Sequence, residues 1–382
     1  MRYRIVHRTA YRYASPVYES FNEVRLQPCS GETQTCLSFD LAIDPPATII
    51  TFKDYYGNAV HDFGVPYLHD HLAIEATGDV VTFAEADQPL VGPRADEPDR
   101  SPALAGLAED PLIADEWSEF LSASAYVALE EASGALARAI LAPDADLSAY
   151  GFLTRAGTYI RDHFTYQVGA TNVSTTVAEV IAGGSGVCQD YAHLLIALCR
   201  HVGLPARYVS GYLGNVTQSS ASHAWTEAYV PPYGWLGLDP TLGTPCTGRH
   251  VKVAIGRDYT DVPPVRGTYR GGGEASLDVE VRGETLEDSQ GISLTPPAGD
   301  EWGRRRLIQY QTLGTMAQMQ RLGAMTQSLG GMTQTLGTDT VSEILGMRHQ
   351  HGETEIPRQQ PQQQQQAGAA SAPTRNRDED RR

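Results

Sequence analysis

Cys188 stands where a protein chain favours a reactive thiol. It follows the glycine-rich segment 183–186 and begins an expected apolar helix from about Val187 to His201. Backbone N–H groups at the start of a helix, together with the helix dipole, favour negative charge and therefore the thiolate form of a cysteine. The same N–H groups can receive the oxyanion that forms when a thiolate attacks a carbonyl group. The position predicts a cysteine nucleophile.

A cysteine nucleophile needs a base, and His223 has the best setting for that role among the histidines that follow. It opens the segment 223–230, in which large side chains stand at every second position, as in a β-strand. A turn at 231–234 leads to a second strand that ends at Asp239. Asp239 can return beside His223 and hold its imidazole in one tautomer, as the third member of a catalytic triad does.

This arrangement depends on the register of the hairpin. Residues paired directly across antiparallel strands share a face, so the imidazole and the carboxylate meet if Trp225 pairs with Asp239. The aspartate then lies diagonal to His223, about 7–8 Å away by Cα geometry and within side-chain reach. A shift of one residue would put the two groups on opposite faces. We therefore expect an odd-numbered connection, or a bulge, between the strands.

Four segments around these residues resemble the bacterial transglutaminase-like cysteine enzymes. They are GVCQDYAH (186–193), GLPARYVSGY (203–212), SHAWTEAY (222–229) and GWLGLDPT (234–241). Residues 1–83 are similar to the β domain that precedes this core in many bacterial members, and residues 250–273 are similar to the family's continuation beyond the aspartate. The resemblance to the catalytic core covers about 150–285.

The resemblance implies a fold and a reaction. The fold is α+β: a papain/transglutaminase-like core of helices packed on an antiparallel sheet, preceded by an antiparallel β-sandwich-like domain. In the reaction Cys188 attacks a carboxamide carbonyl, His223 acts as base and then acid, and Asp239 orients the imidazole. The thioester acyl-enzyme is resolved by water, as in a peptidase or amidase, or by an amine, as in a transglutaminase. Hydrolysis is the first expectation, because water is always present and no amine pocket can be recognised.

Composition divides the chain into four parts. Residues 1–83 alternate polar and apolar side chains and form the expected N-terminal β domain. Residues 84–145 form an acidic, proline-rich linker followed by helical periodicity over Trp117–Leu141. Residues 146–285 form the expected catalytic domain, which begins with a helix from Leu147 to about Phe164.

The fourth part, residues 286–382, matches no pattern of a catalytic domain. Leucine and methionine residues within 313–336 follow a heptad-like spacing, which would suit a helix that docks on a protein partner. Glycines interrupt this segment and weaken an isolated helix, so a flexible extension is the alternative. The glutamine-rich tail from Gln359 is expected to be disordered.

Charge and cysteine usage narrow the partners and the compartment. A net charge of −17 and a pI near 5.0 argue against nucleic acid or an anionic membrane as a partner. Five cysteines without a C-x-x-C pair indicate neither a disulfide scaffold nor a zinc ribbon. Residues 1–13 lack the continuous apolar stretch of a secretory signal, and no apolar run is long enough to span a membrane. We expect a bacterial cytoplasmic protein with reduced thiols and no cofactor.

Other residues have a structural explanation beside a functional one. Cys199 lies in the apolar part of the helix that Cys188 begins, so we expect it in the core. Tyr166, Gln167 and Trp225 are weak candidates for substrate binding, and packing explains Trp225 more simply. Three histidines at positions 61, 69 and 71 could suggest a metal, but such spacings are common by chance and we expect no metal site. The calcium-loop pattern of animal relatives does not occur.

The alternative to an enzyme is a non-catalytic protein-binding scaffold with a transglutaminase-like fold. In that hypothesis the β domain and the segment 313–336 recruit partners, and Cys188 is an inert helix cysteine. A scaffold does not need a cysteine, a histidine and an aspartate that could act together as a catalytic triad. The presence of all three therefore favours the enzyme.

Overall fold

A computed structural model describes residues 1–286 apart from 95, 145, 170, 172–174 and 215–221. The segment 313–336 and the glutamine-rich tail lie outside the described residues, as does nearly all of the extension 286–382. Within the described part no helix combines the length and the apolar character that a membrane crossing requires.

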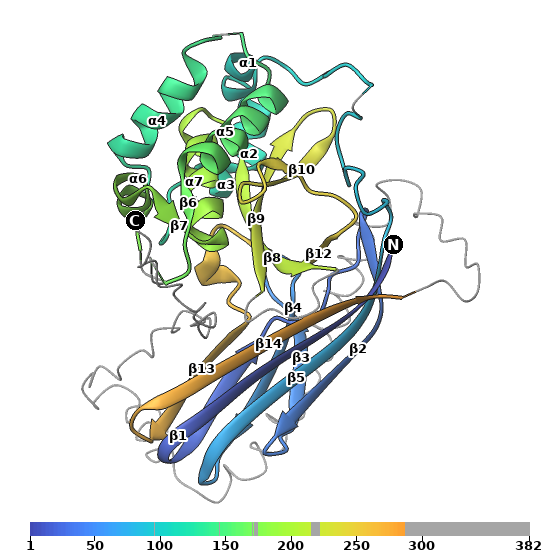
Figure 1. Ribbon diagram of the computed structural model, residues 1–382, viewed down its shortest axis with the longest axis vertical. Helices are drawn as coiled ribbons and strands as arrows, with labels where there is room; N and C mark the ends of the chain where they lie inside the picture. The colour runs from blue at the N-terminus through green and yellow to red at the C-terminus, as the bar shows by residue number, and fades with distance from the viewer. Residues whose placement is uncertain (95, 145, 170, 172–174, 215–221, 287–382) are drawn as a thin grey trace, which may run out of the picture. The chain divides into compact units, whose positions relative to one another are not determined.

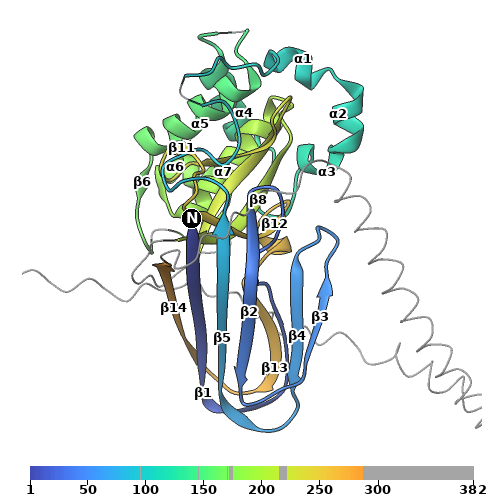
Figure 2. The same cartoon turned by 90° about the vertical axis from the view of Figure 1, so that its right-hand side faces the viewer.

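The N-terminal sheet is antiparallel and is organised around its longest strand (Figures 1 and 2). Its strands are β1 (Arg2–Val24), β2 (Gln34–Asp44), β3 (Ile49–Lys53), β4 (Ala59–Val65), β5 (His69–Thr82), β13 (Val265–Gly271) and β14 (Ala275–Thr285). The first half of β1 pairs with β5 and β14, and its second half pairs with β4 and β13. The register shifts between Arg12 and Val17 and again between Tyr18 and Phe21. Such irregularities bend and twist a strand, which lets the sheet curl.

The expected β domain is confirmed as an antiparallel sheet, but the sandwich is not. One seven-stranded curled sheet replaces two separate sheets, because β1 is long enough to serve both halves. Alternate residues of its strands, such as Val17, Phe63 and Ile74, are buried in a common core inside the curl. Alternation of this kind is the pattern from which the strands were expected.

The assignment of residues 265–285 to the catalytic domain needs a correction. β13 and β14 were expected to belong to the catalytic domain, yet both pair with β1. The sheet therefore takes strands from either side of the core in the sequence. Local patterning predicts that residues 276–282 form a strand, but it contains nothing that says which strand they join.

The core consists of helices on an antiparallel sheet, as expected (Figure 1). The sheet has the order β11-β10-β9-β8-β12. Its strands are β8 (Ala206–Leu213), β9 (His223–Val230), β10 (Gly234–Asp239), β11 (Thr244–Pro245) and β12 (His250–Gly256). The helices are α1 (Leu104–Ala108), α2 (Pro111–Glu116), α3 (Ser118–Leu121), α4 (Glu131–Leu141), α5 (Ala149–His163), α6 (Val177–Gly183) and α7 (Cys188–His201), with a 3-10 turn at Tyr259–Asp261. Two short strands, β6 (Thr165–Tyr166) and β7 (Ser185–Gly186), pair in parallel.

Helix α7 is the centre of this core. Residues Leu194 to Leu198 have no exposed surface, and the Thr226 hydroxyl of β9 donates to the Ala192 carbonyl over 3.1 Å. A helix that is apolar on all sides is stable only when neighbours cover all of it. The expected helix over 187–201 is thereby confirmed, and its first residue, Cys188, is fixed by the most buried element of the fold.

The single helix expected over Trp117–Leu141 is wrong. Helix α3 ends at Leu121, and α4 begins only at Glu131. The Arg200 guanidinium of α7 is buried and donates to the carbonyls of Phe120 (3.0 Å) and Ser122 (2.8 Å). These carbonyls are free to accept because the helix stops here, and the bonds satisfy a charge that burial would otherwise penalise.

Side-chain amides join the two sheets along β12, the edge strand of the core sheet. Gln34 accepts from the Lys252 N–H (2.7 Å) and donates to the Lys252 carbonyl (2.8 Å). Asn58 accepts from the Ile255 N–H (2.8 Å) and donates to the Ile255 carbonyl (2.8 Å). Each amide thus replaces a neighbouring strand and covers the open edge. The N-terminal domain in this way fixes the position of β12.

Candidate active site

The turn before Cys188 is held by a buried carboxylate. Asp190 accepts from the Val187 N–H (2.8 Å) and from the Thr171 hydroxyl (2.6 Å). Gly186 must be small, because a Cβ there would lie 2.9 Å from the Asp190 Cβ. The first N–H groups of α7 lie beside Cys188, whose side chain is only partly buried. The thiol is therefore accessible at the positive end of a rigid helix.

We expect Gly186→Ala to disturb this turn. The added methyl group would push on Asp190 and loosen the Val187 contact, at a cost of about 1–3 kcal/mol in the free energy of unfolding. Cys188 should also react more slowly with iodoacetamide. Gly183→Ala is the matched control, since no atom lies within 4 Å of a Cβ there. Urea unfolding and alkylation rates measured on both variants check the prediction, and equal behaviour would contradict it.

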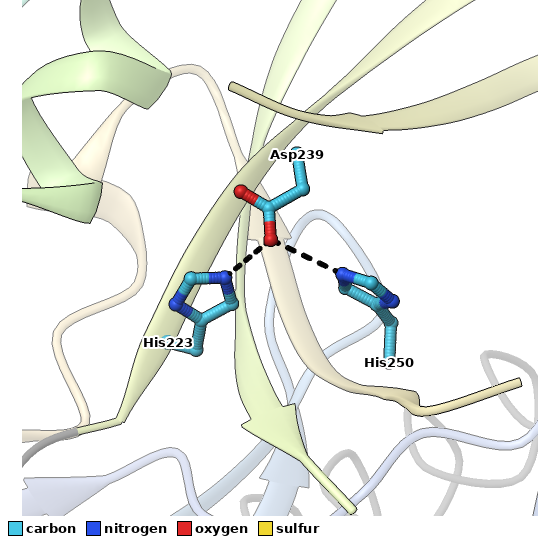
Figure 3. Close-up of side chains that lie close together, drawn as sticks. All are labelled: His223, Asp239 and His250. Carbon is cyan, nitrogen blue, oxygen red and sulfur yellow. Dashed lines mark hydrogen bonds and ion pairs between the residues drawn. The ribbon is translucent and has the colours of Figure 1, made fainter. Parts of the chain in front are cut away.

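His223 and Asp239 meet as the hairpin register requires. Tyr229 pairs with Trp235 and Thr226 with Leu238, so the next position places Trp225 opposite Asp239. Residues 231–233 connect the strands, which confirms the odd-numbered connection. His223 Nε2 lies 2.7 Å from Asp239 Oδ2. Figure 3 shows the hydrogen bond between the two side chains.

Electrostatics favour the protonated form of His223. Burial alone would lower its pKa from 6.5, but the charge of Asp239 and hydrogen bonds with Asp239 and Cys188 raise it to about 10. Asp239 has no exposed surface, and its pKa is held below the usual value by His223 and His250 although burial acts in the opposite direction. Since His223 Nε2 is bonded to Asp239, Nδ1 is the ring nitrogen that remains for Cys188.

His250 is a component of the site that sequence reasoning missed. Its Nε2 lies 3.2 Å from Asp239 Oδ2, the oxygen that also receives His223 (Figure 3). It begins β12, which pairs with β8 and not with the hairpin. Only the order of strands in the sheet brings it to Asp239. A histidine that follows the aspartate and opens an apolar run was the one signal available.

His223, Asp239 and His250 could in principle hold a metal ion, since their ligand atoms lie within 4.8 Å of one another. The hydrogen bonds give a different account of the cluster. His250 Nδ1 accepts from the Thr247 N–H (3.0 Å), so in the neutral ring the proton is on Nε2. A protonated Nε2 has no lone pair for a metal, and donation to Asp239 satisfies it.

The weak candidates for substrate binding have different positions. Tyr166 is 46% exposed and lies beside Cys188, and burial and the neighbouring Cys188 both raise the pKa of its hydroxyl. The Gln167 side chain is exposed, and its backbone N–H is already donated to the Gly186 carbonyl (3.0 Å). Trp225 is 1% exposed and packs edge-on against His250, so it lies beneath the site.

The remaining cysteines lie away from this cluster or beneath it. All five thiols are free, and Cys199 is buried in α7 as expected. Burial raises the pKa of the Cys29, Cys36, Cys199 and Cys246 thiols.

This geometry agrees with the family to which the chain belongs. Residues 134–240 match the transglutaminase-like superfamily, and residues 3–81 match the bacterial transglutaminase-like N-terminal region. The chain is a member of the transglutaminase-like superfamily that carries the bacterial N-terminal region. The resemblance inferred from the four sequence segments is thereby confirmed.

Three similar proteins illustrate the membership. An uncharacterized protein of Mycobacterium leprae is 32% identical over 287 residues, which are 73% of this chain and 97% of the relative. A crystal structure from Cytophaga hutchinsonii, named a putative cysteine protease, has a TM-score of 0.58 and 24% identity and covers 78% of this chain and 94% of its own; it shows the shared fold. A protein-glutamine gamma-glutamyltransferase of Pseudomonas aeruginosa is 38% identical over 66 residues, 15% of this chain and 10% of that protein.

Proposed function

We propose that this protein is a cysteine-dependent acyl-transfer enzyme that acts on a peptide, isopeptide or amide bond through Cys188, His223 and Asp239. The observation that carries the proposal is the 2.7 Å hydrogen bond between His223 Nε2 and the buried Asp239 Oδ2. It fixes the imidazole with Nδ1 toward the one cysteine that begins a helix. This is the relation between nucleophile, base and orienting group that covalent catalysis uses.

The first half of the reaction forms a thioester. The proton of the Cys188 thiol already rests on His223 Nδ1, as the raised pKa of the imidazole favours, and the thiolate sulfur attacks the carbonyl carbon of the substrate amide. The first hydrogen bond within α7 runs from the Tyr191 N–H to the Val187 carbonyl, so the N–H groups of Cys188 and Gln189 are directed out of the helix end. They can receive the oxyanion. His223 then protonates the leaving nitrogen as the C–N bond breaks.

The second half releases the acyl group. Water or a primary amine, deprotonated by His223, attacks the thioester carbonyl, and the sulfur leaves as the thiol or thiolate. Two of the similar proteins are named for amide chemistry, the Cytophaga hutchinsonii structure as a putative cysteine protease and the Pseudomonas aeruginosa relative as a protein-glutamine gamma-glutamyltransferase. We favour hydrolysis, because no described feature near Cys188 selects an amine over water.

Iodoacetamide labelling tests the proposal against a non-catalytic scaffold. At pH 7 we expect Cys188 to be alkylated about a hundredfold faster than Cys29 or Cys36, because burial raises the pKa of both of those thiols. His223→Ala should remove most of that advantage. Peptide mapping by mass spectrometry measures each site separately. If Cys188 reacts no faster than the other two, and His223→Ala changes nothing, the scaffold is the better description.

A further inference from the structure

The Asp239 carboxylate receives more donors than a catalytic triad supplies. Oδ2 accepts from His223 and from His250, over 2.7 and 3.2 Å. Oδ1 accepts from the backbone N–H groups of Thr241 (2.9 Å) and Leu242 (3.4 Å). Its two imidazole donors come from different strands, β9 and β12 (Figure 3). The carboxylate is therefore held from several sides, and one of its supports is a histidine without another assigned role.

His250 is built to donate in one direction. Its Nδ1 accepts from the Thr247 N–H (3.0 Å), and its backbone N–H donates to the Thr247 carbonyl (2.9 Å). The ring is 1% exposed and lies edge-on to Trp225, with ring centroids 5.3 Å apart. These contacts fix both the tautomer and the rotamer, so Nε2–H points at Asp239.

The N-terminal domain holds the turn that precedes His250. The Thr82 hydroxyl at the end of β5 donates to the Gly248 carbonyl (2.7 Å), and the Gly248 N–H donates to the Glu85 carbonyl (3.1 Å). A Cβ at Gly248 would lie 2.3 Å from the Glu85 carbonyl oxygen, so the contact is close. His250 thus connects the sheet domain to the carboxylate of the site.

We propose that His250 is a positioning residue, which holds the Asp239 carboxylate toward His223 and thereby keeps His223 Nδ1 directed at Cys188. This inference rests on the proposed function. Without His250, the described donors that still restrain Asp239 are His223 and the two backbone N–H groups, and the carboxylate can turn away from the imidazole. Among the described residues, the charged or titratable groups that face His223 or Asp239 are Cys188 on α7, His250 on β12 and Cys246 beside Gly237.

The test compares His250→Leu with His250→Gln in the full-length protein. Leucine removes both polar contacts, whereas glutamine can donate to Asp239 and accept from Thr247. We expect His250→Leu to slow Cys188 alkylation at pH 7 by about tenfold and His250→Gln to stay within about threefold of the wild type. His61→Leu is the matched control, a buried histidine on β4 that packs on Phe39.

The pH profile separates positioning from a merely structural role. If Asp239 turns away, the alkaline limb of single-turnover acylation, which reports loss of the His223 proton that the leaving nitrogen needs, should fall by about one pH unit in His250→Leu. If the alkaline limb moves to higher pH, His250 only weakens the negative charge of Asp239. If neither the alkylation rate nor the limb changes, His250 neither positions Asp239 nor weakens its charge. Both results overturn the proposal.

Two further measurements test whether the variants fold and whether the proposed function itself holds. Circular dichroism melting identifies a His250→Leu variant that does not fold; His250→Asn then replaces it, since asparagine is too short to reach both partners. Equal alkylation of the asparagine and glutamine variants overturns the inference. If His223→Ala does not change the alkylation rate of Cys188, the proposed function is wrong and the inference about His250 is wrong with it. If the alkylation rate of Cys188 depends on His223 but not on the residue at position 250, only the inference about His250 is overturned.

Discussion

Cys188→Ala is expected to abolish acyl transfer, with a loss of at least about ten-thousandfold in product formation. The methyl side chain leaves no atom that can form the thioester, while the turn held by Asp190 and the His223–Asp239 pair stay in place. Mass spectrometry of products from a peptide library, with and without a primary amine, measures the loss. The same data show whether the wild type hydrolyses the peptides or attaches the amine.

The matched control is Cys36→Ala, which removes a partly buried thiol of β2 outside the site. Its product formation should equal that of the wild type. Trapping by intact mass adds a second readout, because only a chain with Cys188 should gain the mass of an acyl group. Product formation by Cys188→Ala within tenfold of the wild type would rule out Cys188 as the nucleophile.

Asp239→Asn is expected to lower the rate of Cys188 acylation by at least about a thousandfold at pH 7. Aspartate offers two acceptor oxygens to four donors, whereas asparagine offers one oxygen and turns an N–H group toward a donor. The imidazole then loses both its negative neighbour and its fixed tautomer. Single-turnover acylation measures the effect. Asp162→Asn is the control, an exposed carboxylate paired with Arg161.

The pH dependence of this variant has a definite sign. In the wild type Asp239 raises the pKa of His223 to about 10, so the protonated imidazole persists through neutral pH and is lost only as the pH rises through that value. Without the negative charge, burial lowers the pKa of the imidazole and only the contribution of Cys188 opposes it, so the pKa falls below 10. The alkaline limb of single-turnover acylation, in which His223 protonates the leaving nitrogen, should therefore move from near pH 10 to a lower pH. A limb that stays near 10 would show that Asp239 does not control His223.

Local patterns predicted the parts of the site that depend on neighbours in the sequence. The glycine turn before an apolar run places Cys188 at a helix start, and the parity of the hairpin fixes which face carries His223 and Asp239. His250 could not be predicted, because its approach to Asp239 depends on β12 pairing with β8 and on the N-terminal domain covering the edge of β12. Pairing partners are decided by tertiary packing, which a single sequence does not display.

Tertiary packing also explains the two fold predictions that were wrong, the single helix over 117–141 and the assignment of the strand at 276–282 to the catalytic domain. Helical periodicity continues across 122–130, but the buried Arg200 guanidinium needs free carbonyls there, and a charge buried by another segment leaves no local trace. The strand at 276–282 was recognisable from its composition, whereas its partner β1 is separated from it by the whole core.

The pairing of β1 with β14 determines when the N-terminal sheet can be completed during synthesis. The first half of β1 receives β5 within the first 82 residues, but its other side stays unpaired until β14 is made. An open strand edge invites pairing with other chains. The ribosome must therefore deliver the entire core before the sheet around β1 can close, and the nascent protein carries an exposed strand edge while the residues between β5 and β14 are made.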